Sequence, residues 1–162
     1  MADPRFVVGV DLGTTNSVIA YVDTATGLSD ADAPIVQVLA IPQLVKAGVV
    51  ETRDRLPSFM YLPVAGRLAA ESIALPWGAS DRVTGEFART RGAEVPARVV
   101  ASAKSWLCAV DADPRAPILP WGAPDDVAKV SPVDASAAYL GHMRAAWDAT
   151  MPVPLAEQDV YL

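Results

Sequence analysis

The stretch Phe6–Asp23, FVVGVDLGTTNSVIAYVD, joins two short apolar runs through a polar turn. The first run, Phe6–Val10, is rich in β-branched residues, which predicts a strand buried on both faces. The second run, Val18–Val22, is predicted to be its hairpin partner, because the connection Leu12–Ser17 is short and contains a glycine. The hairpin would place the acidic side chain of Asp11 where the first strand ends.

The tip of this hairpin has the chemistry that a nucleotide phosphate needs. Gly13 lets backbone N–H groups approach closely, and successive N–H groups in a tight turn form an anion-binding concavity. Thr14 and Thr15 add hydroxyl donors, and Asp11 is a hard oxygen ligand suited to Mg²⁺, directly or through its bound waters. The alternative is a polar turn without a ligand, since turns favour Asp, Gly, Thr and Asn for conformational reasons.

The string VGVDLGTTNSVIAYVD resembles the first phosphate-binding motif of the DnaK-type chaperones, the seventy-kilodalton heat-shock family. This family belongs to the actin and sugar-kinase superfamily of ATPases, and DLGTTNS is more specific than a loose glycine pattern. The resemblance implies that the hairpin wraps the phosphates of ATP or ADP. Asp11 would then help to hold Mg²⁺ through water, while Gly13, Thr14, Thr15 and Asn16 would contact phosphate.

Composition sets further bounds on function. The chain has 162 residues, of which 52% are hydrophobic and 20% charged, which is typical of a folded domain. Its formal net charge of −6 argues against a broad basic surface for nucleic acid. We expect no membrane partner, because no apolar run reaches transmembrane length. The start, MADPRF, lacks the features of a signal peptide, so a bacterial-type cytoplasmic location is expected. With Cys108 as its single cysteine, the chain has no intrachain disulfide.

A second candidate site residue lies in the stretch Pro96–Cys108, PARVVASAKSWLC, which is predicted to be a helix. Its expected apolar face comprises Val99, Ala103, Trp106 and Leu107. Lys104 stands among these apolar neighbours, which is unusual for lysine. SAKSWL matches a lysine-containing segment of the same family, and the resemblance implies that Lys104 is catalytic and stabilises charge on the transferring phosphoryl group. The alternative is a lysine that extends from a half-buried helix into solvent. Cys108 and the single histidine, His142, are expected to be structural, with the cysteine buried.

The remaining chain predicts a sheet interrupted by smaller elements. Pro34–Ile41 is predicted as a third strand of the same sheet. Arg55–Leu62 is predicted as a strand that begins at a proline, and it resembles the family's T-P-S segment, although Leu56 stands where the family has threonine; no ligand contact is assigned to Ser58. Helices are expected within Arg67–Ala74 and over Ser80–Arg91, with Ser80 as the cap and Phe87 facing inward.

The last third of the chain predicts a long capped helix followed by a strand. Ser131 is a good N-cap, Pro132 suits the first helical position, and Asp134 can complete the cap. The expected buried face comprises Val133, Ala137, Leu140, Met143 or Arg144, and Trp147. Asp159–Leu162 is predicted to begin the next strand.

Together these features predict an α/β fold with a ribonuclease H-like (actin-like ATPase) core, of which the chain supplies the first lobe. Residues 1–41 and 131–162 would belong to the core, and 42–130 to an inserted, smaller α+β peripheral subdomain. The expected function is that of a DnaK-like chaperone ATPase that hydrolyses ATP with Mg²⁺ to control binding of client proteins, aided by cochaperones. We expect the 162 residues to be a fragment with almost no activity alone. A sugar-kinase-like phosphotransferase and an actin-like assembly ATPase are the alternatives.

Overall fold

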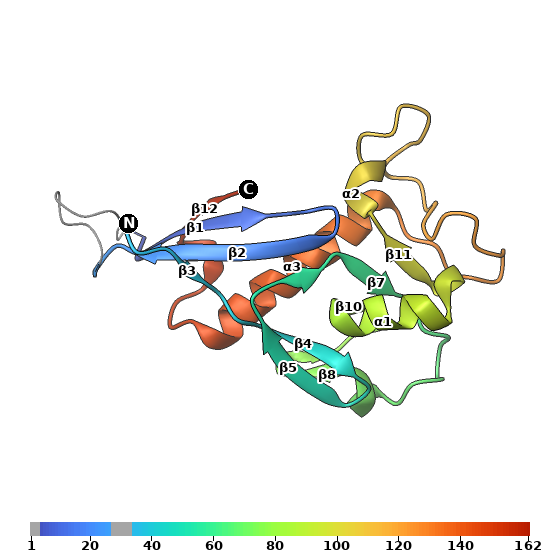
Figure 1. Cartoon of the computed structure of the whole chain (residues 1–162), viewed down its shortest axis with the longest axis horizontal. Coiled ribbons are helices and arrows are strands. Elements are labelled where there is room, and N and C mark those ends of the chain that lie inside the picture. Colours follow the sequence, from blue (N-terminus) through green and yellow to red (C-terminus); the bar gives the residue numbers. More distant parts are fainter. Residues whose placement is uncertain (1–3, 27–33) are drawn as a thin grey trace.

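The structure, a computed structural model, describes residues 4–26 and 34–162 and has a mixed α/β fold (Figure 1). The strands are β1 (Phe6–Asp11), β2 (Asn16–Asp23), β3 (Gln37–Val38), β4 (Ile41–Lys46), β5 (Val49–Arg53), β6 (Leu56–Pro57), β7 (Phe59–Tyr61), β8 (Ala74–Leu75), β9 (Gly78–Ala79), β10 (Val83–Thr84), β11 (Val99–Ala101) and β12 (Asp159–Tyr161). The helices are α1 (Glu86–Glu94), α2 (Ala103–Trp106) and α3 (Pro132–Thr150), with 3₁₀ turns at Ala70–Ile73, Pro96–Arg98 and Leu155–Glu157.

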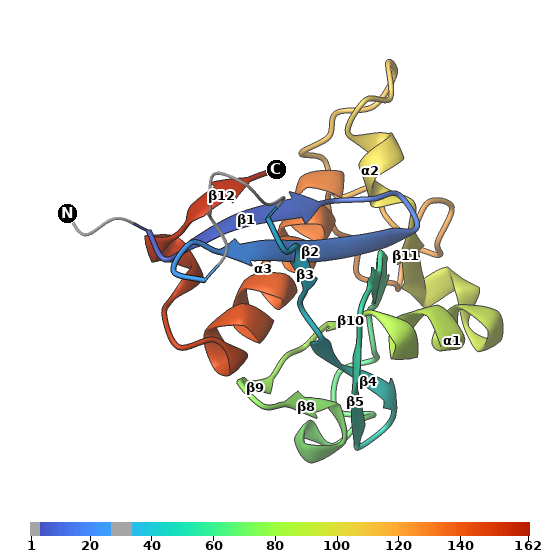
Figure 2. The ribbon, with the colours of Figure 1, turned by 60° about the vertical axis from the view of Figure 1, so that its left-hand side comes forward.

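The predicted hairpin is confirmed and lies at the centre of the main sheet. β1 and β2 are antiparallel, with Asp11 opposite Val18 at the closed end. The sheet has the order β12-β1-β2-β3, with β12 parallel to β1 and β6 added at the end of β2. Asp159–Leu162 does begin the expected strand. The long helix α3 crosses behind this sheet in both views (Figures 1 and 2).

The prediction that the first strand is buried on both faces is wrong. Phe6 and Val8 are buried against α3, whereas Val7 is 39% exposed and Gly9 is exposed on the opposite face. Successive side chains of a strand point to opposite faces, and α3 covers one of them. An uninterrupted apolar run therefore does not show by itself that both faces are covered.

The cap of α3 is confirmed, but its buried face differs from the prediction. The Asp134 N–H donates to Ser131 Oγ at 3.0 Å, and that hydroxyl donates to Asp134 Oδ2 at 2.8 Å. Met143 and Trp147 are buried as expected, whereas Val133 is 40% exposed. The buried residues are Pro132, Ala135, Ser136, Tyr139, His142, Met143, Ala146 and Trp147. The helix packs on the sheet and also against β4, β10 and α2, so its buried arc is rotated and wider than one stripe.

Two of the predicted elements in the peripheral region are shorter or later than expected. α1 begins at Glu86, and Gly85, with φ of 92°, precedes it in place of the predicted Ser80 cap. Val83–Thr84, inside the expected helix, forms a strand that pairs with β7. Phe87 is buried, as predicted, in a second core cluster. Within Arg67–Ala74 the helical part is a single 3₁₀ turn.

The third predicted strand, Pro34–Ile41, is divided between two sheets. Gln37–Val38 pairs with β2 and so extends the main sheet as expected. Ile41 already begins β4, which pairs with β5 in a separate two-stranded sheet. The peripheral region therefore starts within the segment that was predicted to be one continuous strand.

The prediction of one helix over Pro96–Cys108 is also wrong. Val99–Ala101 is the strand β11, paired with β7, and α2 is one short helix that begins at Ala103. Ser102, with φ of 54°, separates the two. The adjacent β-branched residues Val99 and Val100 favour a strand, and pairing with β7 buries both.

Candidate phosphate-binding hairpin

The tip of the β1–β2 hairpin is tight enough to require glycine at position 13. A Cβ added to Gly13 would lie 2.0 Å from the backbone oxygen of Asn16, far inside van der Waals contact. The turn thus brings two backbone segments together where no side chain fits. Glycine thereby permits a tight turn, and successive backbone N–H groups in a tight turn can form a concavity that binds an anion.

Ser58, just after β6, holds this tip in place. Its backbone N–H donates to the oxygen of Thr15 at 2.9 Å, and its hydroxyl donates to the oxygen of Gly13 at 2.8 Å. Because the Ser58 hydroxyl proton is used in that bond, the hydroxyl of Ser17 donates to Ser58 Oγ, 3.0 Å away. Ser58 is 1% exposed and Ser17 is fully buried. No contact was assigned to Ser58 from the sequence, because its partners Gly13, Thr15 and Ser17 lie far away in the sequence.

The side chains predicted to bind phosphate and metal point away from the core. Asp11, Thr14 and Thr15 are exposed, and Asn16 is half-buried. Within residues 4–26 and 34–162, these side chains make no hydrogen bond or ion pair with protein. They are therefore available to a ligand, while the backbone beneath them is fixed by Ser58.

Lys104 reaches the same end of the molecule through β7 and β11. Phe59 follows Ser58 directly and pairs with Ala101, three residues before Lys104. Ala103 is fully buried in the core cluster against which Leu12 packs. Both views show α2 beside the closed end of the hairpin (Figures 1 and 2). Lys104 itself is exposed, and in the described part of the chain it has no ion pair.

Asp11 is the one predicted metal-binding residue, and its surroundings suit a hydrated ion. Across the two described ranges, no three His, Cys, Asp or Glu side chains lie close enough together to hold a metal. An ion at Asp11 would therefore keep most of its ligands as water and phosphate oxygens. Mg²⁺ binds in this way, because it loses its waters reluctantly and usually takes one or two carboxylates.

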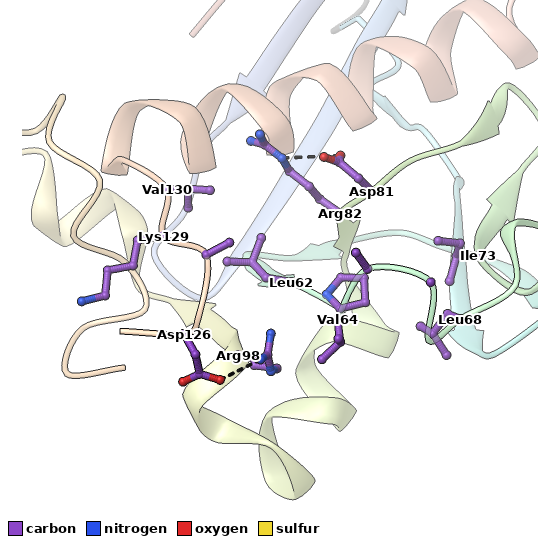
Figure 3. Close-up of a pocket in the computed structure, with 14 residues that line it drawn as sticks. Leu62, Val64, Leu68, Ile73, Asp81, Arg82, Arg98, Asp126, Lys129 and Val130 are labelled. Carbon is purple, nitrogen blue, oxygen red and sulfur yellow. Dashed lines mark ion pairs between the residues drawn. The ribbon is translucent and has the colours of Figure 1, made fainter. Parts of the chain in front are cut away.

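A shallow groove adjoins the hairpin, and a larger one lies in the peripheral region. The first has a volume of about 380 Å³ and is lined by Asn16, Pro57, three arginines and two carboxylates, namely Arg53, Arg55, Arg89, Asp54 and Glu86. The second, of about 620 Å³, lies among Leu62, Val64, Arg82, Arg98 and Lys129 (Figure 3). Neither groove could be predicted from the sequence, because the lining residues come from distant segments.

The single histidine is structural, as predicted, and the single cysteine is not buried. His142 donates from Nε2 to the backbone oxygen of Pro42 at 2.9 Å, so Nδ1 accepts from the hydroxyl of Thr84, 2.7 Å away. Burial lowers the pKa of His142, which keeps the ring neutral. Cys108 is exposed, contrary to expectation. Helix α2 ends at Trp106, so Cys108 lies beyond the helix.

Comparison with known proteins assigns no family to the chain. A scan against protein-family models gave no match. A search of curated proteins gave no significant relative. In the part of the chain that the structure describes, no helix is both long and apolar enough to span a membrane.

Proposed function

We propose that the hairpin tip and Lys104 form the phosphate side of a Mg-ATP site in a DnaK-like chaperone ATPase. The observation that carries this proposal is the position of Ser58. It is hydrogen-bonded to the oxygens of Gly13 and Thr15, and the next residue leads into the strand that pairs with the segment before Lys104. The hairpin tip and the segment around Lys104 lie nearly ninety residues apart in sequence. They are connected in the fold through Ser58 and the pairing of β7 with β11.

The topology of the main sheet supports a ribonuclease H-like core. Three antiparallel strands, β1 to β3, are followed after a long excursion by helix α3 and by β12, which lies parallel to β1. In this proposal residues 1–41 and 131–162 belong to the core, and residues 42–130 to the peripheral subdomain. The expected client proteins and cochaperones would respond to the state of the nucleotide.

The residues of the tip fit the roles that such a site requires. The backbone around Gly13 would bind phosphate oxygens, with the hydroxyls of Thr14 and Thr15 and the amide of Asn16 as further donors. Asp11 would hold Mg²⁺ through water, and the bound ion would supply positive charge to the phosphates. Lys104 would stabilise charge that develops during phosphoryl transfer.

The catalytic role of Lys104 can be tested by substitution. We expect Lys104→Ala to lower ATP turnover by about a hundredfold or more, with little change in nucleotide binding, because the ammonium acts mainly on developing charge. Lys46→Ala is the matched control, since Lys46 is also exposed but lies on β4. Turnover that is equal in the two variants would remove Lys104 from the mechanism.

The proposal also sets an expected affinity for the 162-residue chain. Nucleotides in the superfamily bind between two lobes, and the hairpin provides contacts from one side. Calorimetric titration with MgATP should therefore give a dissociation constant well above the micromolar range. A dissociation constant in the micromolar range or below would contradict a site with contacts from one lobe only.

A further inference from the structure

The groove in the peripheral region has an apolar floor between two arginines, and we call it the arginine groove. Leu62, Val64 and Val130 form part of its floor, and Arg82 and Arg98 lie on opposite sides of them (Figure 3). The volume of about 620 Å³ falls in the usual range for ligand pockets. Lys129 adds a third cation to the lining.

Both arginines are only loosely paired with carboxylates of the chain. Arg98 lies 3.7 Å from Asp126, and Arg82 lies 3.6 Å from Asp81, so neither pair reaches hydrogen-bond distance. Both carboxylates lie at the surface, with 79% of the Asp126 side chain and 84% of the Asp81 side chain exposed. Ion pairs with such exposed carboxylates contribute little to stability, so a ligand can replace them at small cost.

Arg98 is the best-placed anchor in the groove. Its side chain is only 21% exposed, yet in the described part of the chain its guanidinium makes no hydrogen bond. The guanidinium nitrogens are still accessible to solvent, so their unused N–H donors form a planar fork that matches the two oxygens of a carboxylate. A bidentate bond of this kind is charge-assisted and stronger than a neutral hydrogen bond.

We propose that the arginine groove binds an acidic peptide segment of a partner protein, with carboxylates on both sides of an apolar side chain. The two carboxylates would pair with Arg98 and Arg82, and the apolar side chain would cover the floor at Leu62 and Val64. A small inorganic anion leaves this floor unfilled. A nucleic acid carries a charge on every nucleotide and needs a broad basic surface, whereas this groove is lined by three cations and two carboxylates.

A fluorescein-labelled peptide containing Glu-Leu-Glu between serines tests the proposal directly by fluorescence anisotropy. We expect saturable binding that weakens as salt is added, since the groove residues are partly exposed. The same peptide with lysine in place of both glutamates should not bind. The peptide with serine in place of leucine should bind less tightly, because it leaves the apolar floor uncovered.

Variants of the groove separate this site from general electrostatic attraction. Arg98→Glu and Lys129→Glu should each weaken peptide binding by at least about tenfold, because each replaces a positive charge of the groove with a negative one, and Arg98→Glu also removes a charge-assisted bond. Arg115→Glu makes the same charge change at an exposed residue outside the groove and should have little effect. Lys129 is exposed, so its variant should fold, and thermal unfolding would confirm this.

Three outcomes would overturn the proposal. The first is the absence of saturable binding up to millimolar peptide, and the second is equal affinity in Arg98→Glu, Lys129→Glu and Arg115→Glu. The third is complete displacement of the peptide by inorganic phosphate at the same concentration, which would assign the groove to small anions. Asp11→Asn should leave peptide binding unchanged, so the result does not depend on the proposed nucleotide site.

Discussion

The hairpin tip and the arginine groove would bind an anion through different groups, which are backbone groups at the tip and side chains in the groove. At the tip, the backbone itself is positioned, by the absence of a side chain at Gly13 and by hydrogen bonds from Ser58. In the groove, side chains from separate loops and 3₁₀ turns converge on an apolar floor. An anion site made of backbone groups can therefore be recognised in seven consecutive residues of the sequence. An anion site made of side chains from distant segments can be recognised only in the folded structure.

The largest expected effect on the free energy of unfolding concerns the packing of helix α3 against the hairpin. Trp147 is fully buried and packs edge-on against Phe6 and Tyr21, with ring centroids 5.4 Å from each. Trp147→Ala should lower the free energy of unfolding by about 3–5 kcal/mol, measured by chemical denaturation. Trp121→Ala, at a side chain that is 67% exposed and stacks on Trp106, should cost far less. Equal losses would show that α3 does not support the hairpin as described.

A smaller effect is expected for a methyl group added at the tip. Gly13→Ala places Cβ against the backbone oxygen of Asn16 and should cost about 2–3 kcal/mol of stability, since backbone must move. Gly9→Ala is the matched control, because no atom lies within 4 Å of the added Cβ. That control should change the free energy of unfolding by less than about 0.5 kcal/mol. If both variants unfold at the same denaturant concentration, the tip is looser than the structure indicates.

A third effect is expected when the buried hydroxyl of Ser58, which holds the hairpin tip in place, is removed. Ser58→Ala leaves the buried Ser17 hydroxyl without its acceptor and removes the donor to Gly13, at an expected cost of about 1–3 kcal/mol. MgATP binding should also weaken, because the tip loses its fixed conformation. Ser105→Ala, at an exposed serine of α2, serves as control in both measurements. Unchanged stability and binding in Ser58→Ala would contradict the proposed positioning role.

The smallest effect concerns pH and the contact between α3 and the peripheral region. His142 on α3 bonds to Pro42 in β4 and Thr84 in β10, and burial lowers its pKa in the folded protein. Below a pH of about 6.5 the unfolded chain therefore binds a proton that the folded chain does not, and stability falls by up to about 1.4 kcal/mol per pH unit. Above that pH this contribution is fully present.

Denaturation between pH 7.5 and 5.5 can isolate the histidine from the carboxylates, which titrate lower. His142→Gln should be less stable at neutral pH and should show a flatter dependence over this range. A dependence as steep as in the unsubstituted chain would place its origin elsewhere.

The sequence predicted those elements whose signals are local. The hairpin, the Ser131 cap of α3 and the last strand were all confirmed, because turn residues, capping residues and β-branched runs act over a few positions. The α/β class follows from the same elements. The tip residues were predicted to lie together, and they do, although their binding roles remain predictions.

The errors occurred where distant segments compete with local preference. β11 replaced part of a predicted helix because pairing with β7 buries Val99 and Val100. The buried face of α3 was misjudged because it packs against peripheral strands as well as the sheet. Neither the Ser58 brace nor the arginine groove has a local pattern, since each joins residues that are far apart in sequence.

The most direct test of the central claim is a titration of the isotope-labelled chain with MgATP, followed by backbone-amide NMR. We expect progressive changes in the amide chemical shifts of the tip residues Gly13, Thr14, Thr15 and Asn16. The amide chemical shifts around Arg98 and Lys129 should change little. In the Gly13→Ala variant the shifts at the tip should be lost. Shifts confined to the arginine groove, with none at the hairpin, would contradict the claim that the tip binds phosphate.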